Sequence, residues 1–202
     1  MNVHFMAMTT AKTKEKLIEV ARLLFAQKGV ESTTMNDIAI ASKKGRRTLY
    51  TYFKSKSEIY HAVLESEFKI MYISLEAVLN KAISADEKLL EFIEVRLDII
   101  RQVVLRNGTL KAGFFRDIWR VENVRKGFDL QEINYIQTIL NEGVNQHIFE
   151  IENTAIMATV LHHAFKGFEV PYIRGMMKGF APSDGGYRDN LVKLLYNGIK
   201  KQ

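Results

Sequence analysis

Apolar residues recur at helical spacing along most of this 202-residue chain. Five apolar positions, three or four residues apart or adjacent on one helical face, form the first stripe: Leu17, Ile18, Ala21, Leu24 and Phe25. Gly29 follows the stripe, and glycine commonly ends helices because it adopts the left-handed conformation at little cost. The pattern predicts an amphipathic helix that ends near residue 28. Residues 1–11 precede the pattern, and we expect them to form a flexible tail.

Polar residues mark the start of a second, short helix. Thr34 and Asp37 have the spacing of a capping box just before an apolar run, so a helix should start near Met35. The sequence Ser-Lys-Lys-Gly at residues 42–45 then interrupts the apolar pattern. A third short helix is expected at roughly residues 46–53.

The remainder of the chain repeats the helical pattern. Ser55 and Glu58 form another capping-box pair and predict a long fourth helix, and residues 86–106 carry the next apolar stripe. Asp129 and Asn153 are expected to be the N-caps of two later helices. No alternating strand pattern and no internal repeat is present. The predicted fold class is all-α, with about nine helices.

The composition adds exclusions. Hydrophobic residues make up 47% of the chain and charged residues 26%, which is typical of a soluble globular protein. The chain has no cysteine, so disulfides and cysteine nucleophiles are excluded. No apolar run approaches the roughly 18 residues that a membrane span needs, and the N-terminal residues lack a signal-peptide pattern. We therefore expect a cytoplasmic protein with no membrane partner.

The net charge of +6 is concentrated in one segment. Residues 1–60 contain 11 Lys+Arg and 5 Asp+Glu, whereas residues 61–202 contain 18 of each. Residues 38–57 contain no acid and six basic residues: Lys43, Lys44, Arg46, Arg47, Lys54 and Lys56. Charge alone is compatible with a polyanion partner and equally with a solvated basic surface.

The spacing of the two short helices favours a polyanion partner over a solvated basic surface. Two short helices joined by a tight turn form a helix-turn-helix, whose second helix enters the DNA major groove with its N-terminal residues against base edges. Here that helix begins Arg46-Arg47-Thr48, and arginine can bind guanine O6 and N7 in bidentate fashion. Leu49 and Phe53 are four residues apart and form the inward-facing apolar stripe.

The segment at residues 33–56, TTMNDIAIASKKGRRTLYTYFKSK, resembles the DNA-binding region of the TetR/AcrR family of bacterial transcriptional regulators. The resemblance rests on Thr34, Asp37-Ile38-Ala39, Thr48-Leu49-Tyr50 and Tyr52-Phe53, and it covers about residues 12–65. Family members usually carry Ala-Gly where this chain has Ser42-Lys43, and a small residue in place of Arg47. These departures leave the turn geometry open.

The resemblance implies that ten side chains contact DNA, some at phosphates and some at bases. The expected phosphate contacts are Thr34, Tyr50, Tyr52 and Lys56, the expected base contacts are Arg46, Arg47, Thr48 and Thr51, and Lys44 and Lys54 complete the DNA-binding set. The implied domains are a DNA-binding domain at residues 12–57, with its motif at about 33–53, and a helical effector-binding and dimerisation domain at residues 58–202.

The resemblance also implies a homodimer formed by the last two long helices. The segment at residues 154–168 is apolar nearly all round, as expected for a helix that packs on its own core and on a second surface. The expected interface residues are Ile156, Val160, Ala164, Leu191, Leu194 and Leu195. The alternative is a monomer in which both helices are wholly buried.

A small, largely apolar effector is the third implied partner. The middle helices offer an apolar lining with a few polar groups, which is typical of ligand sites. The candidate pocket residues are Phe92, Arg96, Phe115, Trp119, Tyr135, His162 and Phe165. An aromatic stripe at helical spacing is more often core than pocket, so this alternative stays open for each residue.

The predicted function is that of a sequence-specific regulator, a ligand-released repressor that binds a palindromic operator as a homodimer; activation instead of repression stays open. An enzyme is the first competing interpretation, but the chain has no serine elbow, phosphate loop or zinc-protease motif. An all-helical protein-interaction module is the second. We expect no cofactor and no metal, since His61 and Glu65 alone form only a weak pair of ligands.

Overall fold

The computed structural model describes residues 2–106 and 118–173, together with single residues between 186 and 198. Side chains are described for residues 10–100, 102 and 126–167 and for those single residues. Residues 107–117 and most of the chain after residue 173 therefore fall outside the described residues.

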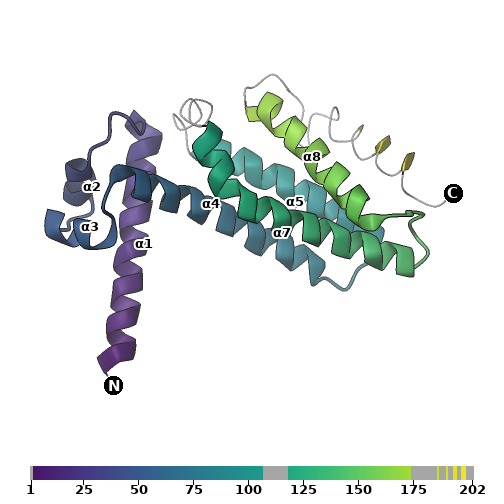
Figure 1. Ribbon diagram of the computed structural model, residues 1–202, viewed down its shortest axis with the longest axis horizontal. Coiled ribbons are helices and arrows are strands. Elements are labelled where there is room, and N and C mark those ends of the chain that lie inside the picture. The colour runs from purple at the N-terminus through teal and green to yellow at the C-terminus, as the bar shows by residue number, and fades with distance from the viewer. Residues whose placement is uncertain are drawn as a thin grey trace. The chain divides into compact units, whose positions relative to one another are not determined.

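The described chain is helical, as predicted (Figure 1). The helices are α1 (Asn2–Lys28), α2 (Met35–Ala41), α3 (Arg46–Tyr52), α4 (Lys56–Leu79), α5 (Ala85–Arg106), α7 (Ile118–Asn145) and α8 (Thr154–Ile173). No β-strand is present among the described residues. These seven helices agree with the all-α prediction of about nine.

The chain divides into two compact units. The first unit comprises Met1–Phe68 and Val103–Val124, and the second comprises Lys69–Gln102 and Arg125–Gln202. The division falls inside α4, which is continuous from Lys56 to Leu79. Helix α4 begins at Lys56, next to the expected boundary at residue 57, and its first half contributes to the core of the first unit. The domain boundaries stay a prediction.

Helix α1 begins earlier than the sequence pattern indicated. It starts at Asn2, within the segment 1–11 that we expected to be a flexible tail. No proline or glycine occurs before Gly29, and alanine, methionine and lysine in this stretch favour the helix. The apolar stripe begins only at Leu17, so it underestimates the length of the helix.

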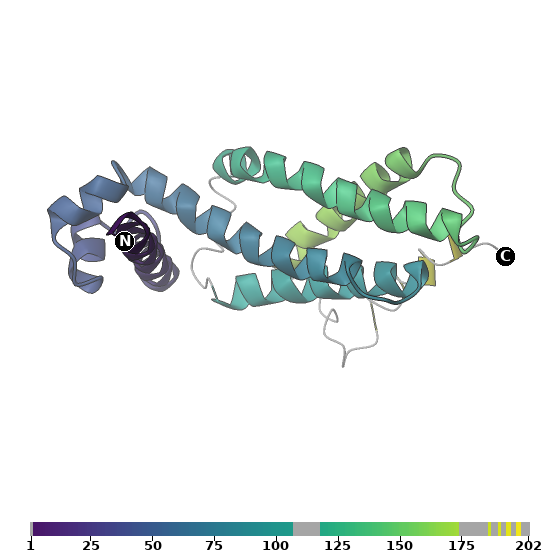
Figure 2. The ribbon, with the colours of Figure 1, turned by 90° about the horizontal axis from the view of Figure 1, so that it is seen from below.

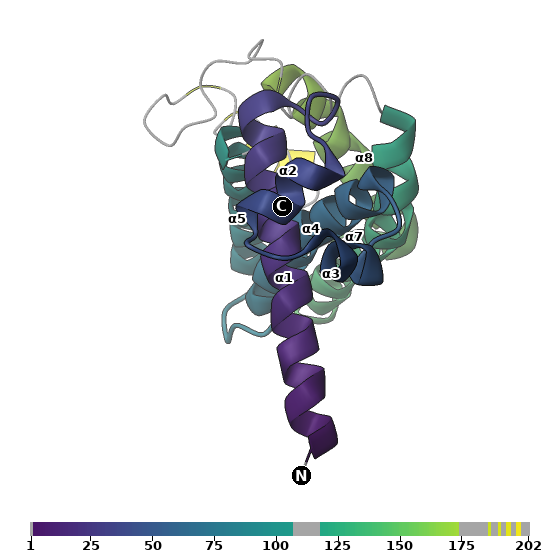
Figure 3. The same ribbon diagram turned by 90° about the vertical axis from the view of Figure 1, so that its left-hand side faces the viewer.

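The first unit is built around α1, against which α2, α3 and the start of α4 pack (Figure 3). Its fully buried members include Leu17 and Phe25 of α1, Ile38 of α2, Leu49 of α3 and Ile59 of α4. Burial of each such side chain contributes about 2–3 kcal/mol. The core thus holds the two short helices, which would not be stable in isolation.

The capping signals behave as predicted at the start of α2. The Thr34 hydroxyl accepts from the Asp37 N–H at 3.1 Å, and the Asp37 carboxylate accepts from the Thr34 N–H at 2.8 Å. Lys28 at the end of α1 also donates to that carboxylate, at 2.7 Å. These contacts lower the pKa of Asp37 to about 2, the Lys28 hydrogen bond being the largest cause. Asp37 therefore links α1 to α2.

The turn between α2 and α3 is a Schellman motif. The Lys43 N–H donates to the Ile40 carbonyl at 3.0 Å and the Lys44 N–H to the Ala39 carbonyl at 3.1 Å. This motif places its central residue in the left-handed region, and Lys43 has a φ of 56° there. Lys43, which stands where family members usually carry glycine, is therefore a non-glycine residue in a conformation that is strained for it.

The second unit is a bundle of the end of α4 with α5, α7 and α8 (Figure 2). The Tyr72 ring of α4 stacks on Phe128 of α7 with centroids 4.9 Å apart. Asn153 caps α8 as predicted, since its carboxamide oxygen accepts from the Ile156 N–H at 3.0 Å. The prediction that Asp129 caps a helix is wrong: α7 begins at Ile118 and runs past Asp129.

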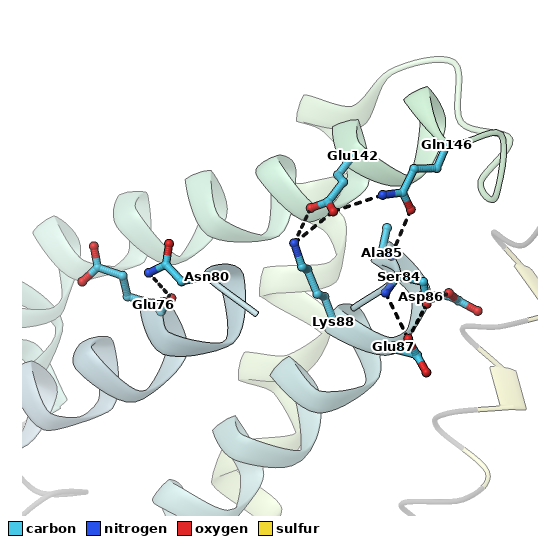
Figure 4. A network of polar contacts seen from close by, with 9 residues as sticks. All are labelled: Glu76, Asn80, Ser84, Ala85, Asp86, Glu87, Lys88, Glu142 and Gln146. Atoms are coloured by element: carbon cyan, nitrogen blue, oxygen red, sulfur yellow. Dashed lines mark hydrogen bonds and ion pairs between the residues drawn. The ribbon is translucent and has the colours of Figure 1, made fainter. Parts of the chain in front are cut away.

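Polar contacts tie α5 to the end of α7 (Figure 4). Lys88, whose side chain is only 8% exposed, donates to both carboxylate oxygens of Glu142 at 2.9 and 2.8 Å. Gln146 donates to Glu142 at 3.1 Å and accepts from the Ala85 N–H at 3.2 Å. The first turn of α5 is thereby fixed to the last turn of α7.

Candidate nucleic-acid interface

One face of α3 is exposed and basic, and the other is buried. Arg46, Arg47 and Thr51 are exposed, and Tyr50 is 45% exposed. Leu49 is fully buried on the opposite side, and Phe53, the C-cap, is buried below it. The inward role predicted for Leu49 and Phe53 agrees with their burial. The first turn of α3 therefore presents two guanidinium groups to solvent.

The basic residues from Arg22 to Lys56 fall into two groups. Arg22, Lys28 and Lys56 bind other parts of the unit, whereas the second group has no side-chain ion pair or hydrogen bond among the described residues. That second group consists of Lys43, Lys44, Arg46, Arg47 and Lys54. All five lie on the α2–α3 turn, α3 or the α3–α4 connection. Between Arg22 and Lys56, the positive charge without an acidic partner is therefore on the helix-turn-helix itself.

The hydroxyl groups of α3 differ in what they already bind. The Thr51 hydroxyl donates to the Arg47 carbonyl at 3.0 Å, which leaves its oxygen free to accept. Tyr52 is half-buried and packs against the core of the first unit. Tyr50 and the half-buried Thr48 have no hydrogen-bond partner among the described side chains. Thr34 is engaged as the N-cap of α2, as described above.

Lys56 is placed differently from the other candidate contacts. Its ammonium donates to the carbonyl oxygens of Val30 at 2.8 Å and Glu31 at 3.1 Å, in the connection between α1 and α2. The sequence pattern could not identify this partner, because the two carbonyls lie 26 and 25 residues away along the chain.

Four of the candidate pocket residues converge in the second unit. Phe92 and Arg96 of α5 and His162 and Phe165 of α8 are all buried to within 1% of complete burial. The Arg96 guanidinium lies 5.6 Å from the centre of the Phe165 ring. Arg96 also donates to Glu132 of α7 at 2.6 Å. Three helices therefore meet at one buried ion pair.

Glu132 is the important residue that the sequence reasoning missed. Its carboxylate is fully buried, and burial would raise its pKa, but Arg96 and His162 together lower that pKa to about 2. One of its oxygens, Oε2, has no hydrogen-bond partner. The available signal was Glu132 facing inward beside Ile136 and Ile139, an acid on the apolar face of α7.

His162 bridges α8 to α7. Its Nε2 lies 3.5 Å from Asp129 Oδ1 and its Nδ1 lies 3.4 Å from Glu132 Oε1. Burial would lower the pKa of His162, but the two carboxylates outweigh burial and raise it. Asp129 also accepts from Lys166 of α8 at 2.7 Å. This geometry explains Asp129, whose carboxylate serves α8 and not the start of a helix.

Of the other candidate pocket residues, only Tyr135 has a described side chain. Tyr135 is half-buried, and its hydroxyl accepts from Gln131 at 2.7 Å near the surface of α7. The side chain of Trp119 and all of Phe115 lie outside the described residues.

Helix α8 has two apolar faces. Ala158, Leu161 and Phe165 are buried, whereas Ile156 is 63% and Val160 is 55% exposed. Ala164 is exposed on the same side, so the three expected interface residues of α8 form an unburied stripe. Leu194 is also exposed, and Leu191 and Leu195 lie outside the described residues.

Neither a metal centre nor a membrane span was found in the described part of the chain. No group of three or more histidine and acidic side chains is arranged there to hold a metal ion. None of its helices combines the length and the apolar character that crossing a bilayer requires.

Known proteins share this organisation. Residues 17–63 match the family described as "Bacterial regulatory proteins, tetR family". The matched segment runs from the middle of α1 through the helix-turn-helix and into α4. It therefore contains all five of the unpaired basic residues.

Relatives extend the similarity beyond this segment. The "Probable acrEF/envCD operon repressor" of Escherichia coli K12 is 26% identical over 179 residues, which is 82% of this chain and 78% of that protein. A transcriptional regulator from Cytophaga hutchinsonii has a TM-score of 0.74 at 23% identity, over 93% of this chain and 98% of that one. A TetR/AcrR-family regulator from Thermobifida fusca has a TM-score of 0.64 at 22% identity, over 91% and 94%. Residues 17–63 thus match the DNA-binding segment of the tetR family, and over most of its length the chain is similar in sequence and fold to TetR/AcrR-family transcriptional regulators.

Proposed function

We propose that this regulator is a ligand-released repressor that binds a palindromic DNA operator as a homodimer. The observation that carries the proposal is the exposed first turn of α3, where Arg46 and Arg47 have no acidic partner among the described residues. The relative from Escherichia coli is named as an operon repressor, which supports repression over activation.

The arrangement supports a specific division of DNA contacts. The first turn of a recognition helix faces base edges, and the flanking groups meet phosphates. We assign base contacts to Arg46, Arg47, Thr48 and Thr51, and phosphate contacts to Thr34, Lys44, Tyr50, Tyr52 and Lys54. Lys44 and Lys54 are the cationic phosphate contacts, so a dimer should neutralise about four phosphates and show a log K against log salt slope of about −4.

Selection of bound DNA from a random pool tests the proposal directly. A dimer with two equivalent helix-turn-helix motifs should enrich an inverted repeat whose half-sites are about one helical turn apart or a multiple of it. A gel shift on the enriched sequence then gives the operator affinity. Enrichment of no sequence, or equal binding to every DNA, would refute sequence-specific recognition.

Arg47 is the sharpest test of base reading. Arg47→Ala should cost about 1–3 kcal/mol on the operator and relax the preference at one base pair. Arg47→Lys is the matched control, because lysine keeps the charge but not the bidentate geometry. It should retain affinity for random DNA while losing preference for the operator. Equal losses on operator and random DNA from Arg47→Ala would assign Arg47 to phosphate.

Release by a ligand would act through the second unit. We place the effector beside the buried cluster of Phe92, Arg96, His162 and Phe165, and α4 is one of the helices that both units share. A shift of α4 would change the separation of the two recognition helices in a dimer. A compound found by thermal shift must weaken operator binding by the same factor by which the operator weakens compound binding. A tightly bound compound that leaves operator affinity unchanged would refute release.

A further inference from the structure

The Lys56 side chain connects two segments that are far apart in sequence. Lys56 is the first residue of α4, and its ammonium donates to the carbonyl oxygens of Val30 and Glu31 at 2.8 and 3.1 Å. It lies 4.0 Å from the Glu31 carboxylate as well. A lysine ammonium has three N–H donors, so two of them are used inside the protein.

The connection that Lys56 holds determines where α2 begins. Gly29 ends α1 with a φ of 85°, and the Thr33 hydroxyl donates back to the Gly29 carbonyl at 2.8 Å. The Thr33 N–H donates to Val30, the same carbonyl that Lys56 binds, at 3.3 Å. Thr34 follows directly as the N-cap of α2. Lys56 is therefore hydrogen-bonded to the α1–α2 connection, which directly precedes the first helix of the helix-turn-helix.

Lys54 provides a natural comparison two residues earlier. It is exposed, and its ammonium has no partner among the described residues, whereas the Lys56 side chain is 30% exposed and bonded to two carbonyls. The two lysines have the same charge and neighbouring positions but different surroundings. Lys54 is thus free to meet a phosphate, and Lys56 is committed to the α1–α2 connection.

We propose that Lys56 is a positioning residue, whose ammonium fixes the α1–α2 connection to the first turn of α4 and thereby sets the position of α2 and α3 relative to α4. The proposal rests on the DNA-binding function proposed above. In this proposal Lys56 affects operator recognition through its hydrogen bonds to two backbone carbonyls, and it does so without contacting a phosphate.

Salt dependence separates a positioning lysine from a phosphate contact. We would measure binding of full-length wild type, Lys56→Met, Lys56→Arg and Lys54→Met to operator and random DNA at several salt concentrations. Lys56→Met should bind the operator about tenfold more weakly, with a smaller loss on random DNA and an unchanged salt slope. Lys56→Arg, which keeps donors, should recover most of the loss. Lys54→Met should instead weaken both DNAs equally and reduce the slope by about 2, because each subunit of the dimer loses one phosphate contact.

A second measurement needs no DNA. In Lys56→Met the amide protons of Thr33, Thr34 and Asp37 should exchange faster than in wild type, while those of α4 beyond its first turn stay protected. Lys54→Met should leave the exchange of these three amides unchanged.

Three outcomes would overturn the proposal. A salt slope reduced by about 2 in Lys56→Met, one phosphate contact per subunit, with equal losses on both DNAs would make Lys56 a phosphate contact. A lower melting temperature with unchanged operator affinity would make it merely structural. Unchanged binding and exchange would give it no role. If wild type binds no specific DNA, the proposed function fails instead, and the exchange experiment still tests the contact.

Discussion

Lys43 shows how one residue can conflict with the local geometry that its neighbours impose. Ile40 and Ala39 accept the hydrogen bonds of a Schellman motif, which requires a left-handed residue between them and α3. Lysine supplies that residue here at a φ of 56°. The cost of the left-handed conformation is about 1–2 kcal/mol for a residue with a side chain. In exchange for this cost, the turn between α2 and α3 carries one more positive charge.

Lys43→Gly should therefore stabilise the protein, by about 1 kcal/mol, because glycine removes the strain. Urea unfolding followed by circular dichroism would measure the change. Lys44→Gly is the matched control, since Lys44 has an ordinary negative φ and should lose rather than gain stability. A destabilised Lys43→Gly variant would contradict the assignment of strain. If Lys43 faces DNA, the same variant should bind DNA less tightly at low salt.

At the scale of helices, α8 is joined to α7 by buried charges as well as by apolar packing. The two nitrogens of His162 face Asp129 and Glu132, and Glu132 in turn binds Arg96 of α5. A protonated imidazole has two N–H donors for these two carboxylates, whereas a neutral one leaves a lone pair facing a carboxylate. The surrounding charged groups, Arg96 and Lys166, are each already bonded to an acid.

Stability should therefore depend on the titration of His162. Because the two carboxylates raise its folded-state pKa above the usual 6.5, its contribution is fully present below that value. The contribution is lost as the pH rises through the folded-state pKa. Urea unfolding between pH 5 and 9 should show the unfolding free energy falling over this range in wild type, and less so in His162→Gln.

The adjacent His163 provides the control for this measurement. It is exposed on the same helix, so His163→Gln should keep the pH dependence of wild type. A wild-type profile that is flat from pH 6 to 9, or one that His163→Gln flattens, would contradict the role given to His162.

For the whole molecule, the exposed stripe of α8 is what makes a dimer the expected state. Ile156, Val160 and Ala164 lie four residues apart on the side of α8 opposite its buried residues. Such a stripe is costly to leave in water and is typical of an interface. A specific operator also requires two motifs, because one helix-turn-helix contacts too few bases.

Val160→Glu should place charges within that interface and produce a monomer. Light scattering should then give a mass near 23.3 kDa for the variant and about twice that for wild type. Operator affinity should fall much more than affinity for random DNA. Thr159→Glu, one position around the helix, is the control for a change of charge alone. A wild-type mass near that of one chain would contradict the dimer.

The sequence alone determined those parts of the protein that depend on neighbouring residues. Capping pairs such as Thr34 and Asp37, the apolar stripes and the basic run at residues 38–57 are local, and they predicted α2, α3, the start of α4 and the DNA-binding motif. Two predictions from neighbouring residues were wrong. Asp129 was expected to be an N-cap but lies within α7. The apolar stripe of α1 begins at Leu17, whereas the helix begins at Asn2.

Only the tertiary structure decided which polar groups meet. Lys56 and Val30 are 26 residues apart, Arg96 and Glu132 are 36 apart, and Lys166 and Asp129 are 37 apart. Each pair forms because helix packing brings the two groups together. The residues around one partner in the sequence do not predict the identity of the other. Burial then sets the strength of these contacts, since a charge removed from water must find its partner within the fold. Of six basic residues in one run, packing thus commits Lys56 to the protein and leaves the other five facing solvent.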